Sequence, residues 1–221
     1  MSRYGLIGFP ISHSQSAELF SAAYHGRYVY DLIETEDFDE AWSRFTDGYD
    51  AVNVTMPFKE QAATRAGIKS PEVLKIGAAN ILVKTSEGIA AYNSDYFAVL
   101  SILHGIIGEG SAQTAAVIGM GGAGKAAAAA ILDSGLELQT FHHDEIAGGV
   151  NADIIFYTLP SAVDGYDKLS CRFLVEANYK NPCLKGINAG YISGETWLRR
   201  QAIYGYELMT GEAPDTKTLN P

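Results

Sequence analysis

The stretch that most constrains the fold of this chain runs from Ala115 to Leu132 and reads AAVIGMGGAGKAAAAAIL. Its apolar start, Ala115–Ile118, has the length and composition of a buried parallel strand. Gly119, Gly121 and Gly124 follow with GxGxxG spacing, and an alanine-rich run that favours a helix comes next. Strand, glycine turn and helix in this order predict a dinucleotide site, because glycine lets the backbone approach a pyrophosphate at a helix N-terminus.

The same residues also begin like a P-loop, because GMGGAGK fits the pattern GxxxxGK. A P-loop needs a Ser or Thr hydroxyl on magnesium after its lysine, but Ala126 follows Lys125 here. This difference disfavours a nucleoside triphosphatase. A glycine turn that binds no ligand is the structural alternative, and the strand and helix on either side disfavour it.

The glycine stretch lies in the middle of a chain of 221 residues, so another structural unit must precede it. A net charge of −10 argues against a nucleic acid or a membrane as partner, but not against a small anionic ligand. Two cysteines are too few for a disulfide framework. We find no signal peptide, long apolar segment or metal-ligand spacing. We therefore expect a cytoplasmic protein that needs no metal.

The first half of the chain alternates between predicted strands and helices. Tyr4–Ile7, Tyr28–Ile33 and Ala51–Val54 have strand-like composition, and Ala17–Tyr24 and Asp37–Phe45 have helical patterns between them. This alternation predicts a parallel sheet with helices on both faces.

Polar residues follow two of these strands. Ser14 and Ser16 precede the first helix, where hydroxyls could bind a carboxylate; capping of that helix by one serine is the alternative. Lys59 follows the third strand, in the crevice where such sheets bind ligands, and suits proton transfer there. A surface lysine is the alternative. Asp95, at the start of a later apolar helix, is either its N-cap or the ionised partner of Lys59.

Five motifs together resemble the shikimate dehydrogenase family. GFPISHSQS is similar to its N-terminal substrate segment, NVTMPFK to its lysine motif, GAANIL to its asparagine loop, YNSD to its aspartate motif and GMGGAGKA to its cofactor loop. They occur in the family's order and at similar spacing. The resemblance covers most of the chain, and NVTMPFK is its most specific part.

The resemblance implies a role for each matching residue. Lys59 and Asp95 would be the proton-transfer pair. Six residues would bind the substrate. Ser14 and Ser16 would bind its carboxylate, and the other parts of the substrate would be bound by Thr55, Asn80, Tyr179 and Gln201. Without the resemblance, a buried polar helix residue is the simpler interpretation of Gln201. The cofactor would be bound by Gly119, Gly121, Gly122, Ala123, Gly124, His142 and His143.

The second half departs from the family pattern. Only DEIAGGVNA separates a predicted strand at Leu138–His142 from the next one at Asp153–Tyr157, where most members insert a helix and another strand. His143 occupies the position of an arginine that reads the 2′-phosphate of NADP, and Asp144 follows it. We therefore expect NADP as the cofactor, by a modest margin, and NAD as a possible one.

The fold implied is α/β: a substrate domain at 1–98, a shortened Rossmann-type NADP domain at 99–193, and a C-terminal helix from about 194 that packs back on the first domain, with the active site between the domains. The implied reaction is the reversible, NADP-dependent reduction of 3-dehydroshikimate to shikimate in aromatic amino acid biosynthesis. The alternatives are an NAD-dependent quinate/shikimate dehydrogenase and a non-catalytic ligand-binding paralogue. The partner would be a small molecule, and the enzyme a monomer or homodimer.

Overall fold

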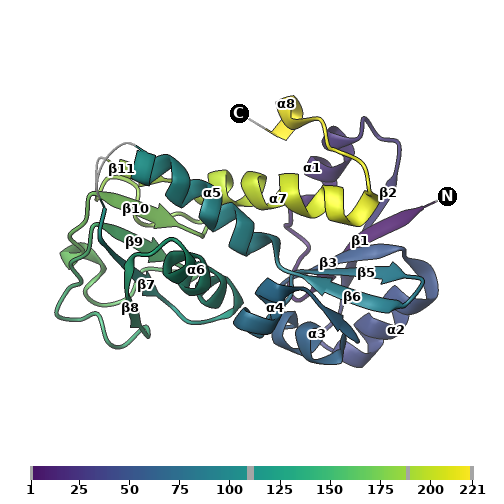
Figure 1. The fold of residues 1–221 in the computed structure, drawn as a ribbon, viewed down its shortest axis with the longest axis horizontal. Helices are drawn as coiled ribbons and strands as arrows, with labels where there is room; N and C mark the ends of the chain where they lie inside the picture. The colour runs from purple at the N-terminus through teal and green to yellow at the C-terminus, as the bar shows by residue number, and fades with distance from the viewer. Residues whose placement is uncertain (1, 109–111, 188–189, 220–221) are drawn as a thin grey trace. The chain divides into compact units, whose positions relative to one another are not determined.

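The computed structural model describes residues 2–108, 112–187 and 190–219 of an α/β protein (Figure 1). Its contacts divide the chain into two compact units, each built on its own sheet. Unit 1 comprises the residues up to Ser94 and those from Gln201 onward, and unit 2 runs from Asp95 to Arg200. The predicted α/β class is confirmed. The domain bounds predicted from the sequence stay a prediction.

Unit 1 contains a six-stranded mixed sheet. Its strands are β1 (Arg3–Gly8), β2 (Val29–Glu34), β3 (Ala51–Val54), β4 (Ile68–Lys69), β5 (Ile81–Thr85) and β6 (Gly88–Tyr92), in the order β2-β1-β3-β5-β6-β4. The pairs β1–β2 and β1–β3 are parallel, as predicted, because helices connect these strands. The hairpin β5–β6 is antiparallel and joins the sheet through β3. The sheet is therefore mixed.

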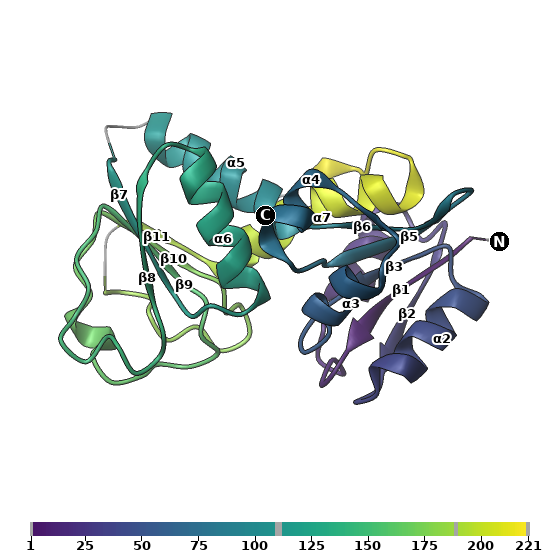
Figure 2. The same cartoon turned by 60° about the horizontal axis from the view of Figure 1, so that its bottom comes forward.

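Helices cover both faces of this sheet (Figure 2). They are α1 (Ser16–Ala23), α2 (Phe38–Gly48), α3 (Lys59–Arg65), α4 (Pro71–Ile76), α8 (Thr216–Leu219) and the part of α7 (Gly194–Thr210) from Gln201 onward. Phe38, Ala41 and Phe45 lie on one side of α2 and, with residues of α3 and α4, fill the core on one face. Asp37 caps α2, because its carboxylate accepts the N–H groups of Asp39 and Glu40.

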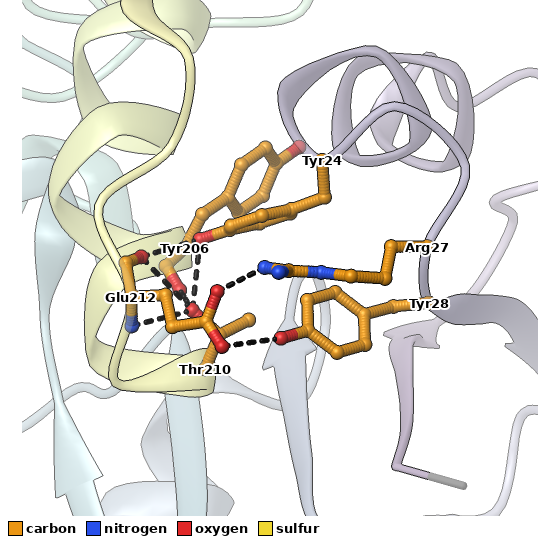
Figure 3. A network of polar contacts seen from close by, with 6 residues as sticks. All are labelled: Tyr24, Arg27, Tyr28, Tyr206, Thr210 and Glu212. Atoms are coloured by element: carbon orange, nitrogen blue, oxygen red, sulfur yellow. Dashed lines mark hydrogen bonds and ion pairs between the residues drawn. The ribbon is translucent and has the colours of Figure 1, made fainter.

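The end of α7 and the residues after it are tied by polar contacts to the segment between α1 and β2 (Figure 3). The Tyr24 hydroxyl contacts Thr210 Oγ1 at 2.8 Å and donates to the carbonyl of Glu212 at 2.9 Å. The Glu212 carboxylate pairs with Arg27 and accepts the Tyr28 hydroxyl at 2.9 Å. The predicted return of the C-terminal helix to the first part of the chain is thus confirmed.

The sequence suggests a loose tail after Pro214, and this prediction is wrong. Thr216–Leu219 form α8, and the Asp215 N–H donates to the carbonyl of Ala23 at 2.9 Å. Leu219 is fully buried, which explains why this short segment folds against α1.

Unit 2 contains a five-stranded parallel sheet. Its strands are β7 (Thr114–Ile118), β8 (Glu137–Phe141), β9 (Ile154–Tyr157), β10 (Phe173–Glu176) and β11 (Gly190–Ile192), in the order β11-β10-β9-β7-β8. The other elements are α5 (Ser94–Gly108), α6 (Gly122–Asp133), the 3₁₀ helix η1 (Tyr166–Lys168) and the first part of α7. The predicted strand, glycine turn and helix correspond to β7, residues 119–121 and α6.

The two faces of this sheet are covered differently. Alternate strand residues such as Val117 and Phe156 pack against α5, α6 and the start of α7. The residues between them, such as Ile118 and Tyr157, pack instead against Ile146 and other loop side chains. The described connection from β8 to β9, residues 142–153, contains neither a helix nor a named strand, so β8 is an edge strand. The predicted shortening of the Rossmann-type half is confirmed.

Within the described ranges, no helix is both long enough and apolar enough to cross a lipid bilayer.

Candidate active site

The two serines predicted to bind a carboxylate contact each other at the start of α1. The Ser14 hydroxyl donates to Ser16 Oγ at 3.0 Å, and the Ser16 N–H donates to Ser14 Oγ at 3.2 Å. Gln15 occupies the N-cap position and makes no capping bond through its side chain, so neither serine is the N-cap residue. Both serines are half-buried. Two adjacent hydroxyls at a helix start can bind an anion by hydrogen bonding alone.

Thr55 and Lys59 lie at the carboxyl end of β3. The Thr55 N–H donates to the carbonyl of Ile7 at 2.9 Å, which holds Thr55 beside the end of β1. A Cβ at Gly8 would lie 2.3 Å from Thr55 Cγ2, so glycine is required for this approach. Lys59 is half-buried and is the first residue of α3. Both residues therefore occupy the edge at which parallel strands commonly bind ligands.

Asn80, Ser94 and Gln201 form one polar cluster in unit 1. Asn80 Nδ2 donates to Ser94 Oγ at 3.0 Å, and the Ser94 N–H donates to Asn80 Oδ1 at 2.7 Å. The Ser94 hydroxyl donates to Gln201 Oε1 at 2.9 Å. Asn80 is 4% exposed and Ser94 is fully buried. Buried amides and hydroxyls need such partners, and the cluster fixes the two predicted substrate residues relative to each other.

Asp95 lies in the first turn of α5, which begins at Ser94. The interpretation of Asp95 as an N-cap is therefore wrong, because the residue is already helical. Its side chain is buried, and Asp95 Oδ1 accepts the indole N–H of Trp197 at 3.0 Å. A carboxylate in this place is oriented by a specific donor and not by bulk water.

The glycine turn between β7 and α6 fits a dinucleotide pyrophosphate. Gly119 has a φ of +93°, which favours glycine, and makes the tight turn. Gly121 is the N-cap of α6 without a side-chain cap, and a Cβ there would meet nothing within 4 Å. A Cβ at Gly124 would lie 1.9 Å from the carbonyl oxygen of Gly119, so helix and strand pack closely only with glycine here. These are the three roles that glycine has in such a turn.

The residues predicted to read the adenosine side lie next to this turn. The Gly119 N–H donates to the carbonyl of Phe141 at 2.8 Å, which places the end of β8 beside the glycines. β8 ends at Phe141, one residue earlier than predicted, so His142 begins the following turn. Its N–H donates to Glu145 Oε2 at 2.6 Å, and the side chains of His142 and His143 are exposed.

Tyr179 lies at the carboxyl end of the sheet in unit 2, half-buried in the loop after β10. It lines a pocket of about 480 Å³. The other residues of the pocket are Asn178, Pro182, Lys185, Tyr191, Ile192, Ser193, Gly194, Glu195, Thr196 and Arg200. The loop is held by the fully buried Glu176, which accepts the Cys183 N–H at 2.7 Å and the Tyr191 hydroxyl at 2.6 Å.

Comparison with known proteins identifies the family. A family model described as the shikimate dehydrogenase substrate binding domain matches residues 6–82. The shikimate dehydrogenase (NADP(+)) of Natronomonas pharaonis is 37% identical over 271 aligned positions, which cover 100% of this chain and 97% of that protein. The chain belongs to the shikimate dehydrogenase family.

The comparison also shows that this member of the shikimate dehydrogenase family is shorter than its relatives. The alignment with the Natronomonas protein has 271 positions, 50 more than the 221 residues of this chain. The shikimate dehydrogenase (NADP(+)) of Anaeromyxobacter dehalogenans is 33% identical over 177 residues, or 77% of this chain. This match spans only 62% of that relative's length.

A solved structure supports the fold of the family in this chain. The crystal structure of shikimate 5-dehydrogenase from Thermus thermophilus, in complex with NADP(H) and shikimate, superposes with a TM-score of 0.84. The sequences are 22% identical, and the superposition covers 99% of this chain and 97% of the other. This likeness concerns the fold.

Sequence reasoning missed two side chains that hold predicted site residues. Trp197 contacts Asp95 across 102 positions of sequence, and no local pattern indicates such a pair. Glu176 shapes the loop that carries Tyr179, but in the sequence it is a single acidic residue at a strand end. Ser94 could be noticed in the sequence, because it belongs to the YNSD motif. Its hydrogen bond to Gln201 could not be predicted from the sequence.

Proposed function

We propose that this chain catalyses the reversible reduction of 3-dehydroshikimate to shikimate with NADPH as reductant, as a step of aromatic amino acid biosynthesis. The observation that carries the proposal is the polar cluster of the buried Asn80 and Ser94 with the half-buried Gln201, which are joined by hydrogen bonds in a member of the shikimate dehydrogenase family. The bonds to Ser94 hold the Asn80 and Gln201 side chains in fixed orientations, which suits them to bind a hydroxylated ligand.

Unit 1 would supply the substrate contacts. Ser14 and Ser16 would bind the substrate carboxylate, since their hydroxyls are adjacent and half-buried at the start of α1. Thr55, Asn80 and Gln201 would bind ring hydroxyls, and Tyr179 of unit 2 would complete the substrate set.

The proton chemistry is assigned to Lys59 and Asp95. NADPH supplies the hydride when it is bound. In the direction of reduction, Lys59 would donate a proton to the ketone oxygen, and Asp95 would orient the resulting hydroxyl. The reverse reaction returns the proton to Lys59.

The glycine turn would hold the cofactor. Gly119, Gly121, Gly122, Ala123 and Gly124 would accommodate its pyrophosphate at the N-terminus of α6. His142 and His143 would face the adenosine ribose from the end of β8. We assign NADP as the preferred cofactor and NAD as a weaker alternative.

The decisive experiment follows the absorbance of the reduced cofactor in four reactions of the purified chain: shikimate or quinate, each with NADP or NAD. We expect the highest kcat/KM with shikimate and NADP. A higher kcat/KM for quinate with NAD would favour the quinate alternative. Binding of shikimate without turnover in any of the four reactions would favour a ligand-binding paralogue.

The proposal also places the enzyme in the cytoplasm, as a monomer or homodimer that acts on a small molecule. Cell fractionation tests the location, and sedimentation velocity measures the assembly state.

A further inference from the structure

The indole of Trp197 contacts the carboxylate of Asp95 inside unit 2. Its Nε1–H donates to Asp95 Oδ1 at 3.0 Å. Trp197 is 4% exposed and Asp95 is 6% exposed. Trp197 comes from the first turns of α7 and Asp95 from the first turn of α5, so the bond joins two helices that are distant in the sequence.

The position of the indole is fixed by packing. Its ring meets the ring of Phe156 edge to face, with a centroid distance of 6.0 Å and an interplanar angle of 83°. Around it lie buried residues of α5, among them Ala98 and Val99. A side chain held in this way cannot change rotamer without opening the core. The donor is therefore stationary, and the carboxylate that accepts from it is oriented by it.

We propose that Trp197 is a positioning residue for Asp95. By holding Oδ1, the indole N–H sets the plane of the carboxylate and hence the direction of its second oxygen, Oδ2. This inference rests on the proposed function only in giving Asp95 a part in the reaction. A tryptophan that merely fills the core is the competing explanation, and it predicts an effect on stability alone.

The first test removes the N–H and keeps an aromatic ring. In Trp197→Phe we expect kcat for shikimate oxidation to fall on the order of tenfold, the scale of a lost hydrogen bond to a charged group, with the KM for NADP unchanged. Trp42→Phe is the matched control, because Trp42 is the other tryptophan and packs in unit 1. It should leave kcat unchanged.

A second variant separates the hydrogen bond from packing if Trp197→Phe is unstable. In the Trp42→Phe protein, tryptophan is replaced during expression by its benzothiophene analogue, in which sulfur takes the place of the indole N–H. The shape at position 197 is retained and only the donor is lost. A drop in kcat on the order of tenfold supports positioning. An unchanged kcat overturns it.

A double-mutant cycle then asks whether Trp197 acts through Asp95. If it does, Trp197→Phe lowers kcat in the parent protein but has little further effect on the residual kcat of Asp95→Ala. Where that residual rate is too low to measure, the affinity for shikimate is compared in the same four proteins. The same fold-change in both backgrounds would mean that the two residues act independently, and would overturn the inference.

The contact itself is tested without turnover. The ¹H–¹⁵N spectrum of the protein should contain two indole resonances, and Trp42→Phe assigns the one from Trp197. We expect Asp95→Ala to shift this resonance and to accelerate its hydrogen exchange. An unchanged Trp197 resonance overturns the inference whatever the activity of the chain. A clear shift in a protein that turns over neither shikimate nor quinate would count against the proposed function and not against the contact.

Discussion

At the scale of single residues, Lys59 is the most exacting test of the proposed chemistry. We expect Lys59→Ala to lower kcat by roughly a hundredfold or more, as general acid catalysis is lost, with a small change in the KM for shikimate. Lys75→Ala is the control, since Lys75 is exposed at the end of α4. Steady-state kinetics on both variants measure kcat and the KM for shikimate and so test the catalytic role of Lys59. A near-normal kcat for Lys59→Ala would remove its catalytic assignment.

Ser14 and Ser16 give a prediction about substrate binding. Either alanine variant should raise the KM for shikimate roughly tenfold, because a hydroxyl that donates to a carboxylate is lost. Ser12→Ala serves as the control, as Ser12 is exposed and precedes the pair. The methyl ester of shikimate should bind weakly to the parent protein in calorimetric titrations. Equal affinity for acid and ester would contradict the assignment.

The predictability of individual residues depends on whether their partners are local. Ser14, Lys59 and Asp95 could be predicted as site residues because each belongs to a short motif whose spacing is visible in the sequence. Trp197 was not, because its partner lies 102 positions away and only the packing of α5 and α7 brings the two together. Motifs thus predict the groups that we propose to contact ligands, whereas the groups that orient them become visible only in the tertiary structure.

At the scale of elements, the glycine turn before α6 offers a matched pair of variants. Gly124→Ala should lower the free energy of unfolding by roughly 1–3 kcal/mol, because the new Cβ would meet the Gly119 carbonyl at 1.9 Å. Gly121→Ala should leave stability unchanged, since its Cβ meets nothing within 4 Å and its φ of −72° suits any residue. It should nevertheless raise the KM for NADP, because the methyl group occupies the space of the pyrophosphate.

Denaturant titration and cofactor kinetics on the two glycine variants separate packing from binding. If Gly121→Ala bound NADP as well as the parent does, the turn would not be the pyrophosphate site.

The contact between α1 and the end of α7 predicts an alkaline instability. Burial raises the pKa of Tyr24 to about 12 from its ordinary value of 10.0. A raised pKa means that the folded state favours the neutral phenol. The contribution of the Tyr24 phenol to the free energy of unfolding is therefore complete below pH 10 and is lost as the pH rises toward 12. Tyr24→Phe should cost about 1 kcal/mol at neutral pH through its lost hydrogen bonds.

The same variant should lose less stability than the parent between pH 10 and pH 12. Chemical denaturation across this range measures the difference, and Tyr166→Phe is the control because Tyr166 is 36% exposed in η1. Parallel stability curves for the parent and Tyr24→Phe would show that Tyr24 does not titrate as described.

The elements that could be predicted are those with a complete local pattern. The strands β1, β3 and β7 have buried apolar runs, and β2 has β-branched and aromatic residues in an alternating pattern. The helix α2 has a capping aspartate and an apolar stripe. β4 was missed because Ile68–Lys69 is too short to carry an alternating pattern. The helix α8 was missed because its stability comes from burial of Leu219 against the rest of unit 1 and not from its own four residues.

At the scale of the whole molecule, the shortening of the second half of the chain changes which residues cover one face of its sheet. A parallel sheet needs both faces covered, and helices usually provide the cover. Here Ile146, Val150 and Leu169 of the loops cover the face opposite α5 and α6. The low count of residues between Phe141 and Ile154 predicted the loss of the helix and strand, but the sequence could not indicate which side chains take their place.

With this loss, the residues that we propose for the adenosine side of the cofactor are few and exposed. The preference between NADP and NAD is therefore a further prediction. Asp144 lies about twenty residues after Gly124, where an acidic side chain would accept the ribose 2′-hydroxyl of NAD and repel the 2′-phosphate of NADP. His143 can donate to that phosphate, but it lacks the permanent charge and the bidentate fork of arginine. We therefore expect NADP to be preferred by a modest margin.

His143→Arg should widen the preference for NADP, since arginine is always charged and binds phosphate bidentately. Asp144→Ala should also favour NADP by removing a repulsion. The measurement is the ratio of kcat/KM for NADP and NAD in the parent and in both variants. A strong preference of the parent for NAD would show that Asp144, and not His143, reads the ribose in this shortened domain.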